Sequence, residues 1–104
     1  MNIVKTLAAV VIITSLSAPA FAETFTFTAI PDQDDSALKA RFGKIANYLS
    51  KELGVDVKYI PVKSYSAAVT AFRNDQVQLA WFGGLSGVRA RSLVKGSQAI
   101  AQGA

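Results

Sequence analysis

The spacing of apolar residues alternates along the chain between a strand-like and a helix-like period. Residues 24–30 alternate threonine with apolar side chains, which predicts a β-strand. From Leu38 to Leu53 the apolar positions follow the 3.6-residue spacing of an amphipathic helix. Asp35 or Ser36 is expected to cap the start of this helix, and Gly54 to follow its end. The same reasoning predicts strands over 55–60, 77–82 and 97–101, a helix from Ser64 to Asn74, and a helix over 85–93.

Strands that alternate with single helices define an α/β protein with a mainly parallel sheet, here in the order β-α-β-α-β-α-β. The nearly all-apolar run over 77–82 is typical of a strand buried on both faces. Ligands of such sheets bind at the carboxyl ends of the strands. The loops at 31–35, 61–65 and 83–87 are therefore expected to share one binding edge.

The first 22 residues have the pattern of a secretory signal peptide. Lys5 precedes an apolar run over 6–16 that is short for a membrane span, and Ala20-Phe21-Ala22 supplies the small-residue cleavage pattern. We therefore expect residues 23–104 to form the mature, exported protein.

Charge and composition restrict the classes of function that the sequence supports. The net charge of +4 is scattered along the chain and forms no basic stripe interleaved with aromatic residues, which argues against nucleic-acid binding. Histidine and cysteine are both absent. The sequence thus gives no support for a metal site, redox chemistry or a cofactor.

Gly83-Gly84-Leu85-Ser86 forms a junction between a predicted strand and a predicted helix. The unpaired N–H groups at a helix start suit an anion, and the Ser86 hydroxyl could add a further donor. Ordinary turn chemistry explains the same residues, with the glycines fitting a tight connection and Ser86 capping the helix. Both interpretations stay open.

Ser86 also invites comparison with the serine nucleophile of a hydrolase. The glycine spacing around it does not match a nucleophile elbow, and the chain has no histidine to act as the base. Lys63 is the remaining candidate base, and nothing in the sequence pairs it with Ser86. A hydrolase is therefore disfavoured.

Three further side chains are candidates for ligand contact. Tyr65 heads a helix at the binding edge, yet its spacing also suits a core residue. Trp81 ends a strand and could line either the core or a ligand. Asp32 lies in an acidic loop, where helix capping and solvation explain it adequately; contact with a cationic group of an aminophosphonate is the alternative.

Several segments resemble the periplasmic solute-binding proteins of phosphate, phosphite and phosphonate ABC transporters, the PhnD-like family, and especially its selenate-binding members. The resemblance covers residues 24–103. It is carried by the segments Thr28-Ala29-Ile30-Pro31-Asp32, Val62-Lys63-Ser64-Tyr65-Ser66-Ala67-Ala68-Val69-Thr70-Ala71-Phe72-Arg73 and Val77-Gln78-Leu79-Ala80-Trp81-Phe82-Gly83-Gly84-Leu85-Ser86.

The resemblance implies part of the first lobe of a type II periplasmic binding protein, a fold with two α/β lobes and a cleft between them. Its expected ligand is a small phosphonate-like, phosphate-like or selenate-like oxyanion. The implied partner is an inner-membrane ABC permease, and the full-length form is expected to be monomeric. Tyr65 and the turn from Gly83 to Ser86 would contact the ligand. Family members are roughly three times as long, so residues 23–104 are expected to be an N-terminal fragment. Binding of a sulfonate or an aminophosphonate, or a half-lobe without function, are the alternatives.

Overall fold

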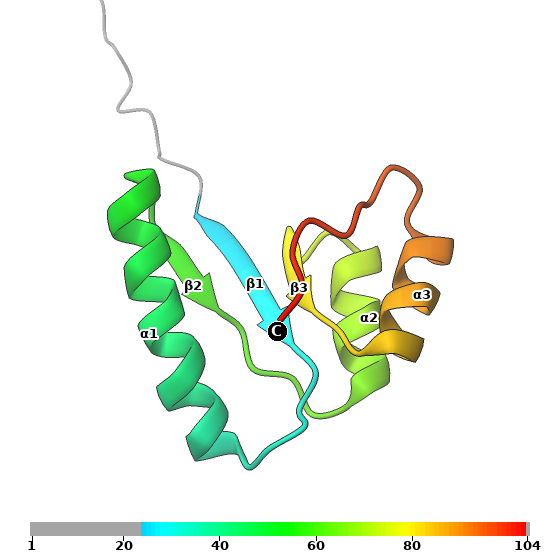
Figure 1. The fold of residues 1–104 in the computed structure, drawn as a ribbon, viewed down its shortest axis with the longest axis horizontal. Helices are drawn as coiled ribbons and strands as arrows, with labels where there is room; N and C mark the ends of the chain where they lie inside the picture. Colours follow the sequence, from blue (N-terminus) through cyan, green and yellow to red (C-terminus); the bar gives the residue numbers. More distant parts are fainter. Residues whose placement is uncertain (1–23, 104) are drawn as a thin grey trace, which may run out of the picture.

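Residues 24–103 are described by a computed structural model, and they form a parallel sheet flanked by helices (Figure 1). The expected signal peptide at 1–22 lies outside these residues. The elements, in chain order, are β1 (Phe25–Ala29), α1 (Asp35–Leu53), β2 (Val57–Tyr59), α2 (Tyr65–Arg73), β3 (Leu79–Trp81) and α3 (Gly84–Leu93). None of these helices is both long and apolar enough to cross a membrane.

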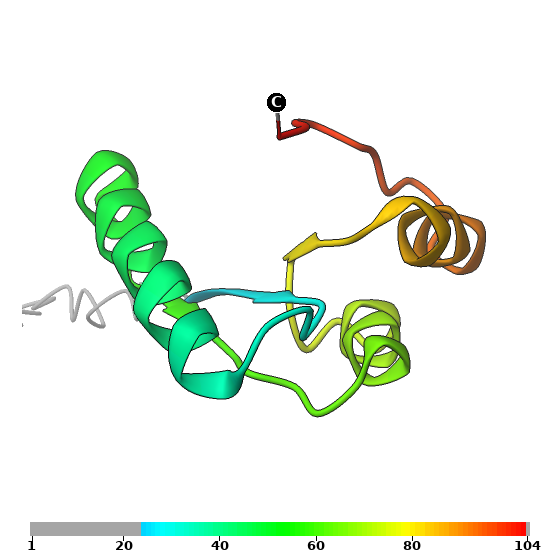
Figure 2. The ribbon, with the colours of Figure 1, turned by 60° about the horizontal axis from the view of Figure 1, so that its bottom comes forward.

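The sheet has the strand order β2-β1-β3, and both neighbours run parallel to β1. This confirms the predicted α/β class with a parallel sheet. The crossover from β1 to β2 runs in the opposite direction to the crossover from β2 to β3. Because such crossovers are right-handed, α1 and α2 are placed on opposite faces of the sheet. Figure 2 shows α1 on one side of the strands and α2 and α3 on the other.

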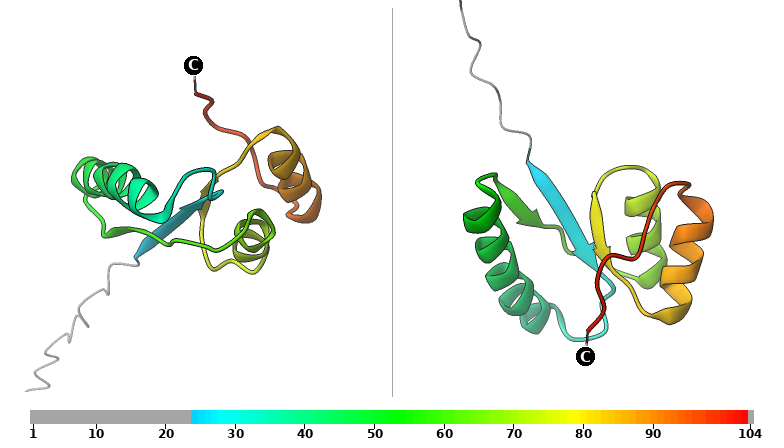
Figure 3. Two further views of the ribbon diagram at one scale, coloured as in Figure 1. Left: turned by 90° about the horizontal axis from the view of Figure 1, so that it is seen from below. Right: turned by 45° about the horizontal axis from the view of Figure 1, so that its top comes forward.

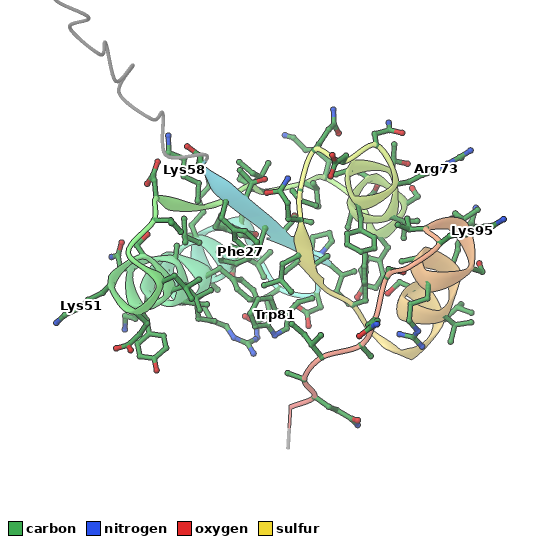
Figure 4. All side chains as sticks on the ribbon, turned by 90° about the horizontal axis from the view of Figure 1, so that it is seen from above. Phe27, Lys51, Lys58, Arg73, Trp81 and Lys95 are labelled. Atoms are coloured by element: carbon green, nitrogen blue, oxygen red, sulfur yellow. The ribbon has the colours of Figure 1, made fainter. Side chains whose placement is uncertain are left out.

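Side chains along β1 point alternately to the two faces of the sheet and make different contacts on each face. Phe27 and Ala29 point toward α1 and pack in one buried cluster with Leu38, Phe42 and other apolar residues of α1 and β2. Thr28 points the other way, and although it is fully buried its hydroxyl donates to the Ile60 carbonyl at 2.6 Å. The hydrogen bond satisfies a polar group that would otherwise destabilise the core. Figure 4 shows Phe27 and Trp81 at the centre of the molecule.

The caps of α1 are confirmed at its end and corrected at its start. Gly54 takes the left-handed conformation, with φ of 69°, and its N–H donates to the Ser50 carbonyl. At the start, however, the cap is Asp34 and not Asp35 or Ser36. The Asp34 carboxylate accepts the Ala37 N–H at 2.9 Å. Asp35 forms an ion pair with Lys39 at 2.9 Å, so its side chain points along the helix.

Two expectations about strands are wrong for the described residues. No strand forms over 97–101, where Ile100 is the one large apolar side chain and is 75% exposed, so that no burial holds the segment in a sheet. The run over 77–82 yields only the three-residue β3, which lies at the margin of the sheet and not within it. Trp81 is 39% exposed as a result. The central strand is β1.

Candidate functional site

The carboxyl ends of the three strands and the first turns of the three helices meet at one end of the molecule, drawn at the bottom of Figure 1. This follows from the parallel strand directions, because each strand leads through a short loop into the helix that follows it. The chain diverges there: the loop after β1 leads to one face and the loop after β3 to the other. A crevice at such a switch point is the usual ligand position in open α/β sheets.

The turn after β3 joins this edge directly. The Ile30 N–H donates to the Trp81 carbonyl at 3.0 Å, which ties the end of β1 to the end of β3. A Cβ built on Gly83 would lie 3.5 Å from the Ile30 side chain. The start of α3 is therefore fixed beside the loop that follows β1.

Ser86 takes part in capping the start of α3, as one of the two interpretations predicted, although Gly83 is the cap residue itself. The helix begins at Gly84, so Ser86 lies in its first turn, and its hydroxyl oxygen accepts the Gly83 N–H at 3.0 Å. That hydrogen bond occupies the Gly83 N–H. Within residues 24–103 the N–H groups of Gly84, Leu85 and Ser86 have no acceptor. These three groups, at the positive end of the α3 dipole, are the donors that the turn offers to an anion.

Gly84 has no structural need to be glycine among the described residues. Its φ is not positive, since only Gly54 and Gly96 among the described glycines have a positive φ. A Cβ at Gly84 would meet no atom within 4 Å. Neither backbone conformation nor packing explains the residue. Glycine at this position leaves room for a group to approach the backbone closely.

Trp81 belongs to an aromatic cluster on the α1 side of the sheet. Its ring centroid lies 5.6 Å from that of Phe27 and 5.4 Å from that of Phe42. The next residue, Phe82, points to the opposite face and contacts Phe72 of α2, with 5.7 Å between the ring centroids. Trp81 is thus largely a packing residue here, and its contact with a ligand remains a prediction.

Tyr65 is the first residue of α2, directly after the cap formed by Ser64, whose hydroxyl accepts the Ala67 N–H at 3.0 Å. The spacing left open whether Tyr65 was a core residue. It is 48% exposed, whereas Ala68 and Val69 of the same helix are buried. Its hydroxyl has no hydrogen-bond partner among residues 24–103. The side chain is therefore available at the binding edge.

Asp32 is exposed in the loop after β1, where its N–H donates to the Ile30 carbonyl at 2.9 Å. Its charge acts on Tyr59. Burial raises the pKa of the Tyr59 phenol, the Asp35 carboxylate raises it further, Lys39 opposes this, and Asp32 adds a smaller upward contribution. The contact of Asp32 with a ligand remains a prediction.

The predicted site residues do not line either of two hollows on the surface of residues 24–103. One, of about 440 Å³, lies between the loops after β1 and β2 and the start of α1, and Lys39 and Lys63 border it. The other, of about 630 Å³, follows α2 from Ser64 to Ala71. The N–H groups of α3, Tyr65, Trp81 and Asp32 thus lie at one edge of the sheet, outside these two hollows. In the described chain Ser86 has no hydrogen bond to a lysine, so the arrangement that a Ser–Lys hydrolase needs is not formed.

Comparison with known proteins identifies the class. The family model for the periplasmic phosphonate substrate-binding protein of ABC transporters matches residues 27–104. The chain is 55% identical over 74 residues to a Prochlorococcus marinus (strain MIT 9301) protein described as a probable ABC transporter phosphite binding protein, PhnD1. It is 35% identical over 69 residues to the phosphate-import protein PhnD of Mycolicibacterium smegmatis. The chain belongs to the family of periplasmic phosphonate-binding proteins of ABC transporters.

The matches cover most of this chain and a smaller part of each relative. They include 71% and 66% of the chain but only 25% and 22% of the two relatives, respectively. The crystal structure of the Prochlorococcus PhnD1 protein with methylphosphonate superposes with a TM-score of 0.76 at 51% identity, over 78% of this chain and 30% of that one. A phosphonate-transporter binding protein from Pseudomonas aeruginosa, at 22% identity and a TM-score of 0.65, shows the same fold.

Proposed function

We propose that this chain supplies one wall of the ligand site in an exported substrate-binding protein that delivers a phosphonate-like oxyanion to an ABC permease. The observation that carries the proposal is the start of α3. Three unpaired N–H groups lie there beside a glycine that neither backbone conformation nor packing requires. Membership of the phosphonate-binding family supports an oxyanion as the ligand of these N–H groups.

The chemistry of the turn suits a tetrahedral oxyanion. The N–H groups of Gly84, Leu85 and Ser86 can each donate to an oxygen, and the hydrogen of the Ser86 hydroxyl is free to turn toward the same ligand. Tyr65 offers a hydroxyl from the neighbouring helix. Donors to charged oxygens are among the stronger hydrogen bonds in proteins.

The relatives are associated with phosphite, phosphate and methylphosphonate as ligands or cargo. Selenate, which the sequence resemblance suggested, therefore enters the test as a competing anion. The periplasmic location and the permease partner follow from the family. The proposed role is capture and delivery, without chemical change of the ligand.

The proposal can be tested on the 104-residue chain by following its backbone amides in an NMR titration with methylphosphonate. We expect saturable shifts at Gly84, Leu85 and Ser86, with millimolar or tighter affinity. Amides of the first turn of α1, such as Ser36, provide the internal control. They too begin a helix, but the Asp34 carboxylate already occupies that end.

Competition then ranks phosphite, phosphate and selenate against methylphosphonate. Ser86→Ala removes the hydroxyl and should weaken binding by about 1–3 kcal/mol, the contribution of a donor to a charged group. Equal shifts in the first turns of α1 and α3 would show nonspecific anion binding and overturn the proposal. No shift at either helix would do the same.

A further inference from the structure

The solvent-facing side of α1 carries cations and an aromatic residue at helical spacing. Four exposed residues follow one another at intervals of three, four and three residues, so they lie along one side of the helix. Although the positive charges are scattered along the sequence, the helix brings three of them together, so the expectation of scattered charge does not hold on α1. The four residues are Arg41, Lys44, Tyr48 and Lys51, and we call them the α1 stripe.

The charges of the α1 stripe are not neutralised within the described chain. The two ion pairs of residues 24–103 join Lys39 to Asp35 and Lys58 to Asp56, and neither involves the stripe. Glu52 is the second acid of α1, and it forms no ion pair with a described residue. The α1 stripe therefore presents three positive charges to whatever lies beside it.

The α1 stripe lies outside the packing of the helix against the sheet. That packing comes from the other side of α1, where Leu38, Phe42 and Ala46 are buried. Arg41 borders this side, since its guanidinium carbon lies 5.2 Å from the centroid of the Phe42 ring. No stripe residue lines either of the two hollows described above. The stripe is thus an exposed helix surface about 15 Å long, which suits an extended partner better than a small free anion.

We propose that the α1 stripe binds the surface of a bilayer that contains anionic phospholipids. Lysine and arginine are attracted to the phosphates of such lipids, and a tyrosine beside them suits the boundary between headgroups and acyl chains. Two of the three stripe cations are lysines, which are depleted in protein–protein interfaces, so lipid is favoured over a protein partner. The apolar side of α1 stays in the core, so the contact is electrostatic and reversible.

The α1 stripe lies away from the candidate anion site. Both views of Figure 3 show α1 along one side of the described chain and α2 and α3 along the other. A bilayer that contacts α1 therefore leaves the first turn of α3 uncovered. The family serves ABC transporters, whose permeases lie in a membrane. Contact through α1 would hold the protein near that membrane while the N–H groups of α3 stay free to bind a ligand.

The test measures by sedimentation how the full 104-residue chain partitions onto lipid vesicles. One set of vesicles contains phosphatidylcholine alone, and the other contains equal parts of phosphatidylcholine and phosphatidylglycerol. The readout is the ratio of the two partition coefficients, in which binding through apolar segments cancels. We expect the anionic vesicles to be favoured at least about tenfold at low salt. The preference should vanish in about 1 M salt, where the Debye length is about 3 Å.

Matched double substitutions locate the surface. Lys44→Gln with Lys51→Gln removes two charges from the α1 stripe, whereas Arg73→Gln with Lys95→Gln removes two charges elsewhere and gives the same net charge. Figure 4 shows Lys51 on one side of the molecule and Arg73 and Lys95 on the other. All four side chains are exposed, so circular dichroism should be unchanged. We expect the first pair to lower the ratio about fivefold for each charge removed and the second pair to lower it less than about twofold.

Three results would overturn the inference: a ratio near one for the unchanged chain, equal losses in the two double variants, or displacement from the vesicles by inorganic phosphate at constant ionic strength. Equal losses would show a general effect of net charge, and displacement would identify a small anion as the ligand. The inference does not depend on the phosphonate ligand. Binding to anionic vesicles without amide shifts at α3 on methylphosphonate addition would contradict the proposed function and leave this inference standing.

Discussion

The β1-α1-β2 half of the chain closes a core, whereas the α2-β3-α3 half leaves its surfaces open. In the first half, Phe27, Leu38 and Phe42 are almost fully buried, and both ends of α1 are capped. In the second half, Leu85 and Val88 are exposed, and the N–H groups at the start of α3 are unpaired. The difference suggests a division of roles, in which the first half mainly stabilises the fold and the second half carries the proposed site, so we expect substitutions in the two halves to have different consequences.

The largest effect is expected from Phe42→Ala. Phe42 is 2% exposed and contacts the rings of Phe27, Tyr59 and Trp81. Its truncation should lower the free energy of unfolding by about 3–5 kcal/mol, because it removes apolar contacts and leaves a cavity. Urea unfolding followed by circular dichroism measures the loss.

The matched change on the open half is Leu85→Ala, which should alter the free energy of unfolding by less than about 0.5 kcal/mol. Phe42→Leu retains part of the buried volume and should lie between the two. Similar losses for Phe42→Ala and Leu85→Ala would mean that the two halves do not differ in packing.

Alanine substitutions of two glycines can distinguish a conformational role, at Gly54, from a binding role, at Gly84. Gly54 has a φ of 69°, so Gly54→Ala should destabilise the chain by about 1–2 kcal/mol. Gly84 has no positive φ, and a methyl group added to it would meet no atom within 4 Å, so Gly84→Ala should leave the melting temperature unchanged or slightly raised. The same substitution should weaken the methylphosphonate-induced amide shifts. If the melting temperature fell equally in both variants, Gly84 would be needed for the stability of the fold, and the binding role would be contradicted.

The sequence predicted the order of elements through α3 because Leu38, Phe42 and their neighbours follow a helical period, while Ser64 and Gly54 signal helix ends through local chemistry. It predicted that the loops at 31–35, 61–65 and 83–87 lie together, because the loops that follow parallel strands all lie at the carboxyl edge of the sheet. It could not predict that β1, and not the more apolar 77–82 run, is the central strand, since strand order depends on contacts between distant residues. Nor could it show that Ser86 accepts the Gly83 N–H, which depends on where α3 begins within one residue.

Acid should weaken the closed half through the cap of α1. Hydrogen bonds from the Ser36 hydroxyl and the Ala37 N–H hold the pKa of Asp34 below its ordinary value of 3.8. A lowered folded-state pKa contributes stability above the unfolded pKa and loses it as the pH falls through the folded value. Melting temperatures should therefore decline below about pH 4. Asp34→Asn keeps a side-chain oxygen for the cap and should flatten this decline.

Asp75→Asn is the matched control for that measurement. Asp75 has a φ of 59°, a conformation that asparagine also tolerates, and it caps no helix start. The wild-type slope below about pH 4 should persist in this variant. If Asp75→Asn flattened the curve as much as Asp34→Asn, the α1 cap would not be the source of the acid sensitivity.

Tyr65→Phe is expected to have the smallest effect on stability. It should change ligand affinity without changing the free energy of unfolding. The Tyr65 hydroxyl has no partner among residues 24–103 and the side chain is 48% exposed, so removing the oxygen should change the free energy of unfolding by less than about 0.5 kcal/mol. If Tyr65 donates to the same oxyanion as the N–H groups of α3, methylphosphonate affinity in the amide titration should fall by about 1 kcal/mol. Tyr48→Phe, on α1 and 63% exposed, should change neither quantity. An unchanged affinity in Tyr65→Phe would limit the proposed site on this chain to the first turn of α3. A loss of stability would instead show that the hydroxyl stabilises the fold.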